Sequence, residues 1–348
     1  MGFFQRLFGL SDEGRGSAPG PTDDFWYQNL SAMTVNDALA IPAFSSGVRY
    51  IAESIASLPL HVYERTEDGG RPVARKHPVY YRVHSQPNEY QTAFEYIEQV
   101  VRDLLTIGGH LSVIDLSQRN DVISIEPVLG NWTISKDRQT GVRVFTVHGE
   151  QQRRYVDSEV VFIPGPGSTP WALHSLIEQH AGTLGISKVT REYVHNYFRR
   201  GAVGPIYATL PNNLGPKQRD EWAEFFRKYQ GARNAGSVPI LDGGAKLESL
   251  NIDHGKMQLT DLQRLMVEEC ARILRVPPHK IQDLARSTNN NIEHQGIEAV
   301  VDCLRPWCKR IESRLSSSLL GPIEGTRYYI EFDLDGLLRG DSAAQAAL

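Results

Sequence analysis

The spacing of apolar residues along the chain changes several times between the helical period of three to four residues and the two-residue period of a strand. The clearest helical run extends from Phe94 to Leu105, where apolar side chains recur on one stripe. A candidate capping box at Thr34 and Asp37 begins the first helix, and Pro59 ends it. Helices are therefore predicted at 34–58, 92–106, 170–200, 216–230, 257–275 and 292–319.

Short segments rich in β-branched residues and bounded by turn residues lie between these helices. The segment 60–63 is predicted to form a hairpin with Val73 across a turn at 67–70. Further strands are predicted at 111–116, 122–127, 132–135, 142–147, 160–163, 206–210, 238–241 and 328–334. Because several of these follow one another at roughly ten-residue intervals, we expect an antiparallel, β-rich subdomain and an α+β fold.

The helices at 170–200 and 257–275 enclose a smaller module of different composition. The first is predicted to begin at Ser168 or Thr169, and thirty helical residues span about 45 Å. Two long helices that hold a module away from the body bury little surface within one chain. Neighbouring copies of the chain are therefore expected to pack against them.

The module contains one compact helix, at 216–230, with a strongly aromatic face. The aromatic residues at spacings i, i+3, i+4 and i+7 are Trp222, Phe225, Phe226 and Tyr229. This pattern predicts a buried face, and it also makes the helix a candidate for docking a partner.

The last predicted helix follows a polar loop and contains a proline. The loop consists of Arg286, Ser287, Thr288, Asn289, Asn290 and Asn291. Pro306 lies within the helix and predicts a kink near 302–306. The asparagines are suited to cap this helix, which alone accounts for their presence.

Composition limits the classes of function. The chain has 348 residues, with 37 Lys and Arg against 41 Asp and Glu, and a net charge of −4. Such a balance gives no overall basic field for tight, salt-dependent binding of nucleic acid. No apolar run approaches the roughly 20 residues that span a bilayer, so no membrane insertion is predicted. Cys270, Cys303 and Cys308 lack CxxC spacing, which favours free thiols in a reducing cytoplasm.

The N-terminal residues differ in composition from the rest of the chain. The tract at 11–24 is rich in Gly, Pro, Ser and Asp, so residues 1–33 are predicted to form a flexible segment. Within it, four apolar residues are spaced as in a short amphipathic helix that docks on its own protein or on a neighbour. These are Phe3, Phe4, Leu7 and Phe8.

A search for catalytic patterns finds no nucleotide-binding glycine loop, no GxSxG and no HExxH. Glu331, Asp333 and Asp335 imitate the start of a calcium loop, but Ser342 stands where a bidentate Glu is needed. We interpret them as the acidic face of a strand. The sequence thus predicts no catalytic residue, no metal site and no cofactor.

Several segments of the second half, in this order and spacing, resemble the portal proteins of tailed double-stranded DNA bacteriophages, a family also found in gene transfer agents. The segments are Gly231-Ala-Arg-Asn-Ala-Gly236, Ser237-Val-Pro-Ile-Leu241, Glu269-Cys-Ala-Arg-Ile-Leu-Arg-Val-Pro-Pro278, Ser287-Thr-Asn-Asn-Asn-Ile-Glu293, and Leu304-Arg-Pro-Trp307 through Ile311-Glu312. The resemblance extends over nearly the whole folded chain, from about Ile41 to Asp341.

The resemblance implies an α+β portal fold with a β-rich wing, a two-helix stem, a small α/β clip and a long kinked tunnel helix. The implied divisions are a wing at 34–169, stem helices at 170–200 and 256–278, a clip at 201–255, a candidate tunnel loop at 279–291, a tunnel helix at 292–320, and a wing strand with a truncated crown at 321–348. The loop from Arg286 to Asn291 is then the candidate DNA-channel loop, and the aromatic helix is the candidate clip surface. Arg286 could guide or brake DNA, or it could simply pair with Asp283.

The resemblance also implies a function without catalysis. A homo-oligomeric ring, usually a dodecamer, sits at the capsid vertex of the virion, is assembled in the host bacterial cytoplasm, and forms the channel for packaging and ejection of DNA. Its implied partners are the terminase large subunit, a head–tail connector or adaptor, and the major capsid and scaffolding proteins. Double-stranded DNA passes non-specifically, so the wall should hold few persistent Lys or Arg contacts to phosphates.

Two other classes of function stay open at the level of sequence. One is a metal-dependent nuclease or hydrolase of a mobile element, with Glu331, Asp333 and Asp335 as ligands. The other is a non-catalytic adaptor that binds proteins through the aromatic helix at 216–230. A ring of about a dozen subunits would separate the portal hypothesis from both.

Overall fold

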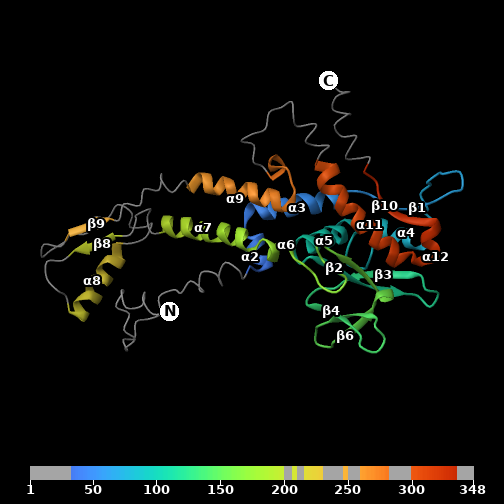
Figure 1. Cartoon of the computed structure of the whole chain (residues 1–348), viewed down its shortest axis with the longest axis horizontal. Helices are drawn as coiled ribbons and strands as arrows, with labels where there is room; N and C mark the ends of the chain where they lie inside the picture. Colours follow the sequence, from blue (N-terminus) through green and yellow to red (C-terminus); the bar gives the residue numbers. More distant parts are fainter. Residues whose placement is uncertain are drawn as a thin grey trace, which may run out of the picture.

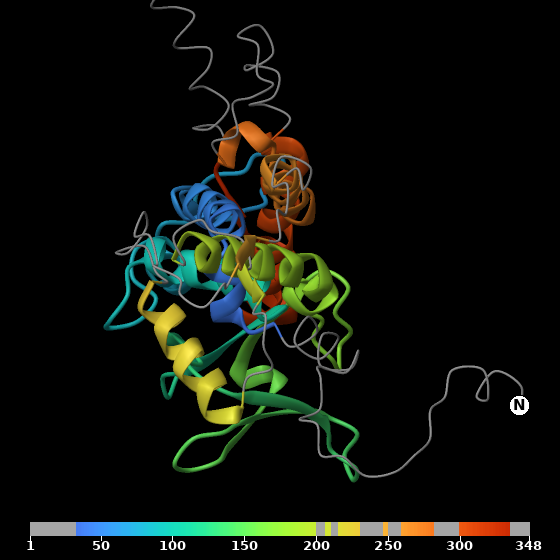
Figure 2. The same ribbon diagram turned by 90° about the vertical axis from the view of Figure 1, so that its left-hand side faces the viewer.

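The computed structural model describes residues 33–199, 206–209, 215–229, 246–249, 259–281 and 299–334. They form a mixed α+β structure, in agreement with the sequence. Two helices, α7 (Ala181–Arg199) and α9 (Leu259–Leu274), lie side by side and lead from a larger body toward a small group of elements at one end (Figure 1). Figure 2 views the molecule from that end, with α8 (Pro216–Tyr229) in front.

The body is built from short helices and antiparallel strands. Its helices are α2 (Val35–Leu39), α3 (Pro42–Ala56), α4 (Pro78–His84), α5 (Ala93–Thr106), α6 (Leu176–Gln179), α11 (Arg305–Leu319) and α12 (Gly321–Arg327). Its strands are β1 (Leu60–Glu64), β2 (Gly109–Leu116), β3 (Val122–Pro127), β4 (Trp132–Lys136), β5 (Arg143–Val147), β6 (Arg153–Val156), β7 (Val160–Pro164) and β10 (Tyr328–Phe332). The sequence did not predict α4, α12 or β6.

The first helical stretch is interrupted, so the prediction of one helix over 34–58 is wrong. The capping box is confirmed, because Thr34 Oγ1 accepts a hydrogen bond from the Asp37 N–H at 3.1 Å and begins α2. A second helix, α3, begins at Pro42. The residue before a proline is pushed out of the helical region, and Ile41 is extended, with φ −81° and ψ 113°.

The predicted hairpin after α3 is reduced to a single bridge between Tyr63 and Val73. The main partner of β1 is β10, which runs antiparallel to it and places Leu60 opposite Phe332. Ile330 and Phe332 are buried, at 2% and 3% exposure, so this pairing completes the apolar face on which β1 lies. The predicted local connection persists on the other edge of β1, where the Ala74 N–H donates to the Val62 carbonyl at 2.8 Å and the Glu64 N–H donates to the Pro72 carbonyl at 3.0 Å.

The antiparallel, β-rich subdomain is confirmed, and it consists of two three-stranded sheets. Their strand orders are β3-β2-β7 and β4-β5-β6. The helices α5 and α11 pack on the first sheet, at β2 and β7, and α3 packs on α5, so that these elements share the main core. A smaller core around Phe145 and Phe162 lies where the second sheet packs against β2 and β7.

The predicted helix over 170–200 begins later than its sequence suggests. Its cap is Ser175, whose Oγ accepts from two backbone N–H groups of α6 and donates to the Thr106 carbonyl at 2.5 Å. Ser168 instead donates to the Gly108 carbonyl at 3.0 Å. The segment between the two serines is held against the body, and α6 and α7 are separate helices that meet at 180–181.

The last helix contains an irregular turn next to Pro306, close to the predicted kink at 302–306. Residues 299–304 form a π-helical segment (Ala299–Leu304), and α11 continues directly from it with Pro306 in its first turn. Proline donates no N–H to the preceding turn, and π-helical turns accommodate such a mismatch within a helix. The preceding part of the predicted helix, at 292–298, lies outside the described residues.

The small group of elements beyond α7 and α9 is partly as predicted. The aromatic helix is confirmed as α8, and β8 (Ile206–Thr209) is confirmed as a strand. Its antiparallel partner is β9 (Lys246–Ser249), which the sequence did not predict. The predicted strand at 238–241 lies outside the described residues.

The three cysteines are free thiols within the core. Burial raises the pKa of Cys270 and of Cys303 to about 11 and that of Cys308 to about 12, so none is a reactive thiolate near neutral pH. Among the described residues, no helix is both long enough and apolar enough to cross a membrane.

Candidate functional site

The predicted DNA-channel loop, from Arg286 to Asn291, lies outside the described residues, but the structure fixes both of its attachment points. The described residues before this segment end at Ile281, and the described residues after it begin at Ala299. Ile281 is 7% exposed and Ala299 is 2% exposed. Both attachment points therefore belong to the core, one in the short 3₁₀ helix Pro278–Ile281 that follows α9 and the other in the π-helical turn.

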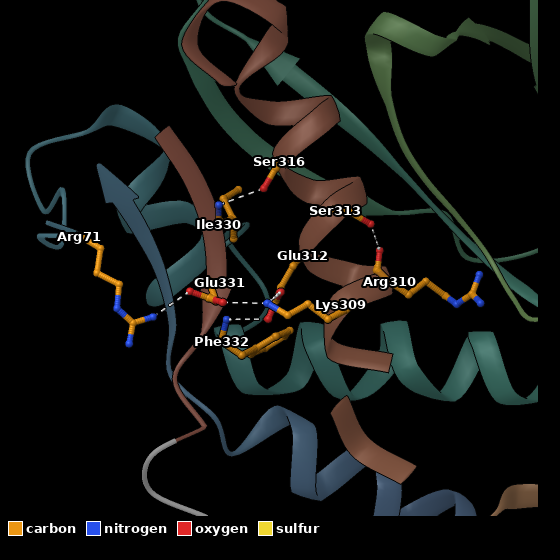
Figure 3. Close-up of polar contacts among 9 residues, drawn as sticks. All are labelled: Arg71, Lys309, Arg310, Glu312, Ser313, Ser316, Ile330, Glu331 and Phe332. Atoms are coloured by element: carbon orange, nitrogen blue, oxygen red, sulfur yellow. Dashed lines mark hydrogen bonds and ion pairs between the residues drawn. The ribbon is translucent and has the colours of Figure 1, made fainter. Parts of the chain in front are cut away.

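The helix that follows this segment, α11, is joined to β10 by a buried carboxylate (Figure 3). Glu312 is 5% exposed and accepts a hydrogen bond from the Phe332 N–H at 3.1 Å. Its other oxygen lies 2.8 Å from Lys309 Nζ, which also reaches Glu331 at 2.7 Å. Burial disfavours the Lys309 ammonium, but the hydrogen bonds to the two glutamates outweigh it and raise the pKa of Lys309.

Two further polar contacts attach α11 to both sides of the body. Ser316 Oγ accepts a hydrogen bond from the Ile330 N–H at 2.9 Å, which again holds β10 (Figure 3). On another side, the Arg310 guanidinium donates to the Pro164 carbonyl at 2.9 Å, at the end of β7. Since α11 packs on both β10 and β7, a displacement of this helix would disturb the packing of two separate sheets.

The outer side of α7 carries an apolar stripe at helical spacing. Ile186, Val189 and Tyr193 follow one another at i, i+3 and i+7, and their side chains are 45%, 39% and 37% exposed. Exposed large apolar residues at this spacing indicate a surface that contacts another chain. The sequence placed Val189 and Tyr193 on the apolar side of this helix, and within the described part of the chain Ile186 and Val189 stay partly exposed.

The opposite side of α7 is fastened to α2. Lys188 Nζ lies 2.7 Å from an Asp37 carboxylate oxygen, and the Arg191 guanidinium donates to the Ala40 carbonyl. The hydrogen bonds from Lys188 and Thr34 lower the pKa of Asp37 below its usual value. The contribution of this pair is therefore present above the ordinary pKa of an aspartate and is lost as the pH falls through the lowered pKa.

Two aromatic side chains of α8 are described, and both are half-buried. Trp222 and Phe225 are of intermediate exposure, and their rings make an edge contact at 5.8 Å between centroids. The side chains of Phe226 and Tyr229 lie outside the described part of the helix. The prediction of a partner surface on α8 is thus neither confirmed nor contradicted.

A buried chain of polar side chains, which the sequence did not predict, lies between α5 and β2. Asp103 Oδ2 is 2.7 Å from His110 Nδ1, and His110 Nε2 is 2.7 Å from Ser112 Oγ. The Tyr96 hydroxyl completes the chain, 3.1 Å from Ser112 Oγ. His110 and Ser112 alternate along β2, so their i, i+2 spacing within a buried strand was a signal for side chains on one face.

This chain has the order of an Asp-His-Ser triad but not its accessibility. Ser112 is 0% exposed and His110 is 1% exposed, so the serine oxygen does not reach solvent or substrate. A nucleophile must approach the reacting atom directly. Burial also raises the pKa of Tyr96 well above its usual value, as expected of a phenol that stays neutral inside the fold. We therefore assign the chain a structural role.

The acidic strand residues considered as metal ligands are engaged elsewhere or not described. Glu331 forms ion pairs with Lys309 at 2.7 Å and with Arg71 at 3.4 Å. Asp335 lies outside the described residues. Among the residues that are described, no group of three or more His, Cys, Asp or Glu side chains is placed to hold a metal ion.

The family of the chain is decided by comparison with family models. The model of the phage portal protein matches residues 42–348, which is most of the chain. The chain belongs to the phage portal protein family. As a portal protein it is a structural component of the portal vertex of the virion, where the DNA channel enters the capsid, and it is not an enzyme. The nuclease hypothesis for Glu331 and Asp333 is thereby excluded.

Two portal relatives match nearly the whole chain. The portal protein of Enterobacteria phage HK97 is 27% identical over 340 residues, which cover 96% of this chain and 80% of that protein. The probable portal protein of Streptomyces phage phiC31 is 26% identical over 383 residues, which cover 98% of this chain and 79% of that protein.

Solved structures show that the fold itself is shared. The crystal structure of an HK97 family phage portal protein from Corynebacterium diphtheriae matches with a TM-score of 0.64 at 19% identity, over 86% of this chain and 95% of that one. A chain from the neck of a native gene transfer agent particle, computed with C12 symmetry, matches with a TM-score of 0.61 at 18% identity. That match covers 95% of this chain and 89% of the other. The α+β portal fold predicted from the sequence is confirmed at this level.

Proposed function

We propose that the chain is the subunit of a twelve-membered ring that forms the channel for packaging and ejection of double-stranded DNA. The observation that supports the ring is the partial exposure of Ile186 and Val189 on α7, in a family whose fold also occurs in a C12-symmetric neck. In this proposal α7 and α9 are the stem, the β-rich body is the wing, and β8, α8 and β9 belong to the clip. Mass photometry of the purified protein tests it, because persistent absence of rings at high concentration would favour a monomeric or dimeric adaptor.

The ring interface includes the stripe of Ile186, Val189 and Tyr193. Substitution of Ile186 or Val189 by Asp places a carboxylate on a surface that assembly removes from water, and a buried unpaired charge costs several kcal/mol. We expect Ile186→Asp or Val189→Asp to raise the concentration needed for half-maximal assembly at least tenfold, as measured by mass photometry over a dilution series.

A matched control for these variants is Ile323→Asp, since Ile323 lies on α12 and is 85% exposed. This control should assemble like the unmodified protein. If all three variants assemble normally, the stripe does not form the interface. If the control fails as well, the effect arises from added charge in general and the proposed surface is wrong.

The segment from Arg286 to Asn291 faces the DNA in this proposal. Its attachment points on Ile281 and Ala299 are buried, so shortening the loop between them leaves the anchors in place. We expect deletion of residues 287–291 to leave ring assembly intact and to lower the yield of packaged or retained DNA. Negative-stain microscopy and nuclease-protected DNA per particle measure the two outcomes separately, and loss of rings would show that the segment is structural.

Docking of other components is proposed for the far end of the stem. The aromatic helix α8 stands away from the body (Figure 1), which makes it reachable by a terminase large subunit or a head–tail connector. Half-buried aromatic side chains such as Trp222 are typical of the centres of protein interfaces. Contacts with capsid and scaffolding proteins belong to the outer wing surfaces in the same proposal.

A further inference from the structure

A groove beside the C-terminal half of α7 has the properties of a binding surface. It has a volume of about 690 Å³ and lies between α2, α7 and α9. Such a volume is within the range of pockets that hold small ligands or several side chains. Ile41, which is 4% exposed, provides an apolar part of the lining together with Ala40 and Val194.

The cations that line the groove are fixed in position. Lys188 is held by the Asp37 carboxylate at 2.7 Å, and Arg191 is held by the Ala40 carbonyl. Both residues are on one side of α7 and both line the groove. Immobilised cations beside apolar surface are suited to aromatic rings, because a ring face attracts a cation while its edges fill apolar space. Glu192 also lines the groove and offers an acceptor for an indole N–H or a phenol.

The described chain begins beside this groove. Thr34 caps α2, and Asp37 and Ala40 of the same short stretch line the groove. Immediately upstream, the sequence contains three consecutive aromatic residues, Phe25-Trp26-Tyr27. Five residues lie between Tyr27 and Met33, and the six steps along the chain extend to about 20 Å, which exceeds the length of a five-residue helix at about 8 Å. The aromatic segment is therefore able to turn back onto the groove of its own chain.

We propose that the groove between α2, α7 and α9 binds the aromatic segment Phe25-Trp26-Tyr27 of the same chain. This contact fastens the N-terminal region to the C-terminal half of α7. It is independent of the proposed ring, because all participants belong to one subunit.

Cross-linking within the full-length protein tests this proposal. The variant Gln28→Cys/Asn196→Cys places one thiol next to the aromatic segment and one on a residue that lines the groove. The native cysteines are buried and have raised pKa values, so they do not compete for a short bismaleimide. We expect an efficient link between positions 28 and 196, detected as a cross-linked peptide by mass spectrometry.

Proximity along the chain alone would also bring these thiols together to some extent. Two further substitutions in the same double-cysteine protein therefore distinguish binding in the groove from proximity along the chain. Trp26→Ala should lower the rate of cross-linking at least tenfold, whereas Asn29→Ala should leave it unchanged. Equal rates with and without Trp26 would overturn the proposal, and circular dichroism confirms that each variant is folded.

The occupant's chain is identified by isotope labelling. Mixed rings or mixed monomers are prepared from a ¹⁵N-labelled chain carrying only Gln28→Cys and an unlabelled chain carrying only Asn196→Cys. We expect no labelled-to-unlabelled peptide, because the segment binds its own subunit. Efficient links between the two kinds of chain would show that the neighbouring copy fills the groove, which contradicts the proposal.

Discussion

Substitution of His110 by Ala is expected to lower the free energy of unfolding by about 3–5 kcal/mol, since several buried polar groups lose their partner at once. His110 connects Asp103 to Ser112 through hydrogen bonds of 2.7 Å on each ring nitrogen. Ser112 is 0% exposed and Asp103 is 19% exposed at its side chain, so water replaces little of what is lost. Urea denaturation monitored by circular dichroism gives the change.

The matched control is His148→Ala. His148 is exposed and makes one side-chain hydrogen bond, to Thr133 Oγ1 at 3.0 Å, so we expect a change within about 0.5 kcal/mol. A small effect of His110→Ala, similar to that of the control, would contradict the structural role. A serine-directed phosphonate gives a second measurement, because a closed triad-like chain should leave Ser112 unlabelled in the folded protein.

Substitution of Glu312 by Ala is expected to cost about 2–4 kcal/mol of the free energy of unfolding, since it leaves the buried Phe332 N–H without an acceptor and removes a partner of Lys309. Glu312→Gln keeps an acceptor oxygen but loses the charge, so it should cost about 1–2 kcal/mol. Hydrogen exchange at the amides of β10 should accelerate in the same order.

Glu53→Ala is the control for this series. Glu53 pairs with Arg49 one helical turn away, and its side chain is 45% exposed, so removal should cost less than about 0.5 kcal/mol. If Glu312→Ala costs no more than Glu53→Ala, the buried carboxylate does not hold α11 on β10. Unchanged exchange at Phe332 alongside a large loss of stability would place the effect elsewhere in the body.

Local signals predicted the elements of this fold well. The capping box at Thr34, the strands between 110 and 165 and the aromatic helix at 216–230 depend on residues that are neighbours in sequence. The errors arose where a distant or steric factor prevailed. Pro42 divides the first helix, and β1 pairs along its length with β10, a strand more than 260 residues away that no local pattern connects to it.

The candidate sites show the same difference between local signals, which the sequence reveals, and contacts between distant residues, which it does not. His110 and Ser112 share a strand face that periodicity could have revealed, but Asp103 and Tyr96 reach them from α5, and no local pattern gives that contact. The family was inferred from the order of several motifs, and the family match confirms that inference. The loop at 286–291 and the side chains of Phe226 and Tyr229 lie outside the described residues, so their roles stay predictions.

The pairing of β1 with β10 has a consequence for when a subunit becomes competent to assemble. Leu60 is opposite Phe332, so the sheet cannot close until almost the whole chain has left the ribosome. Contacts of such long separation form late and slowly. Because α11 is fastened to β10 through Glu312 and Ser316, its final position also awaits that strand. The order of synthesis thus requires that the body of a subunit is completed before neighbouring subunits can join it.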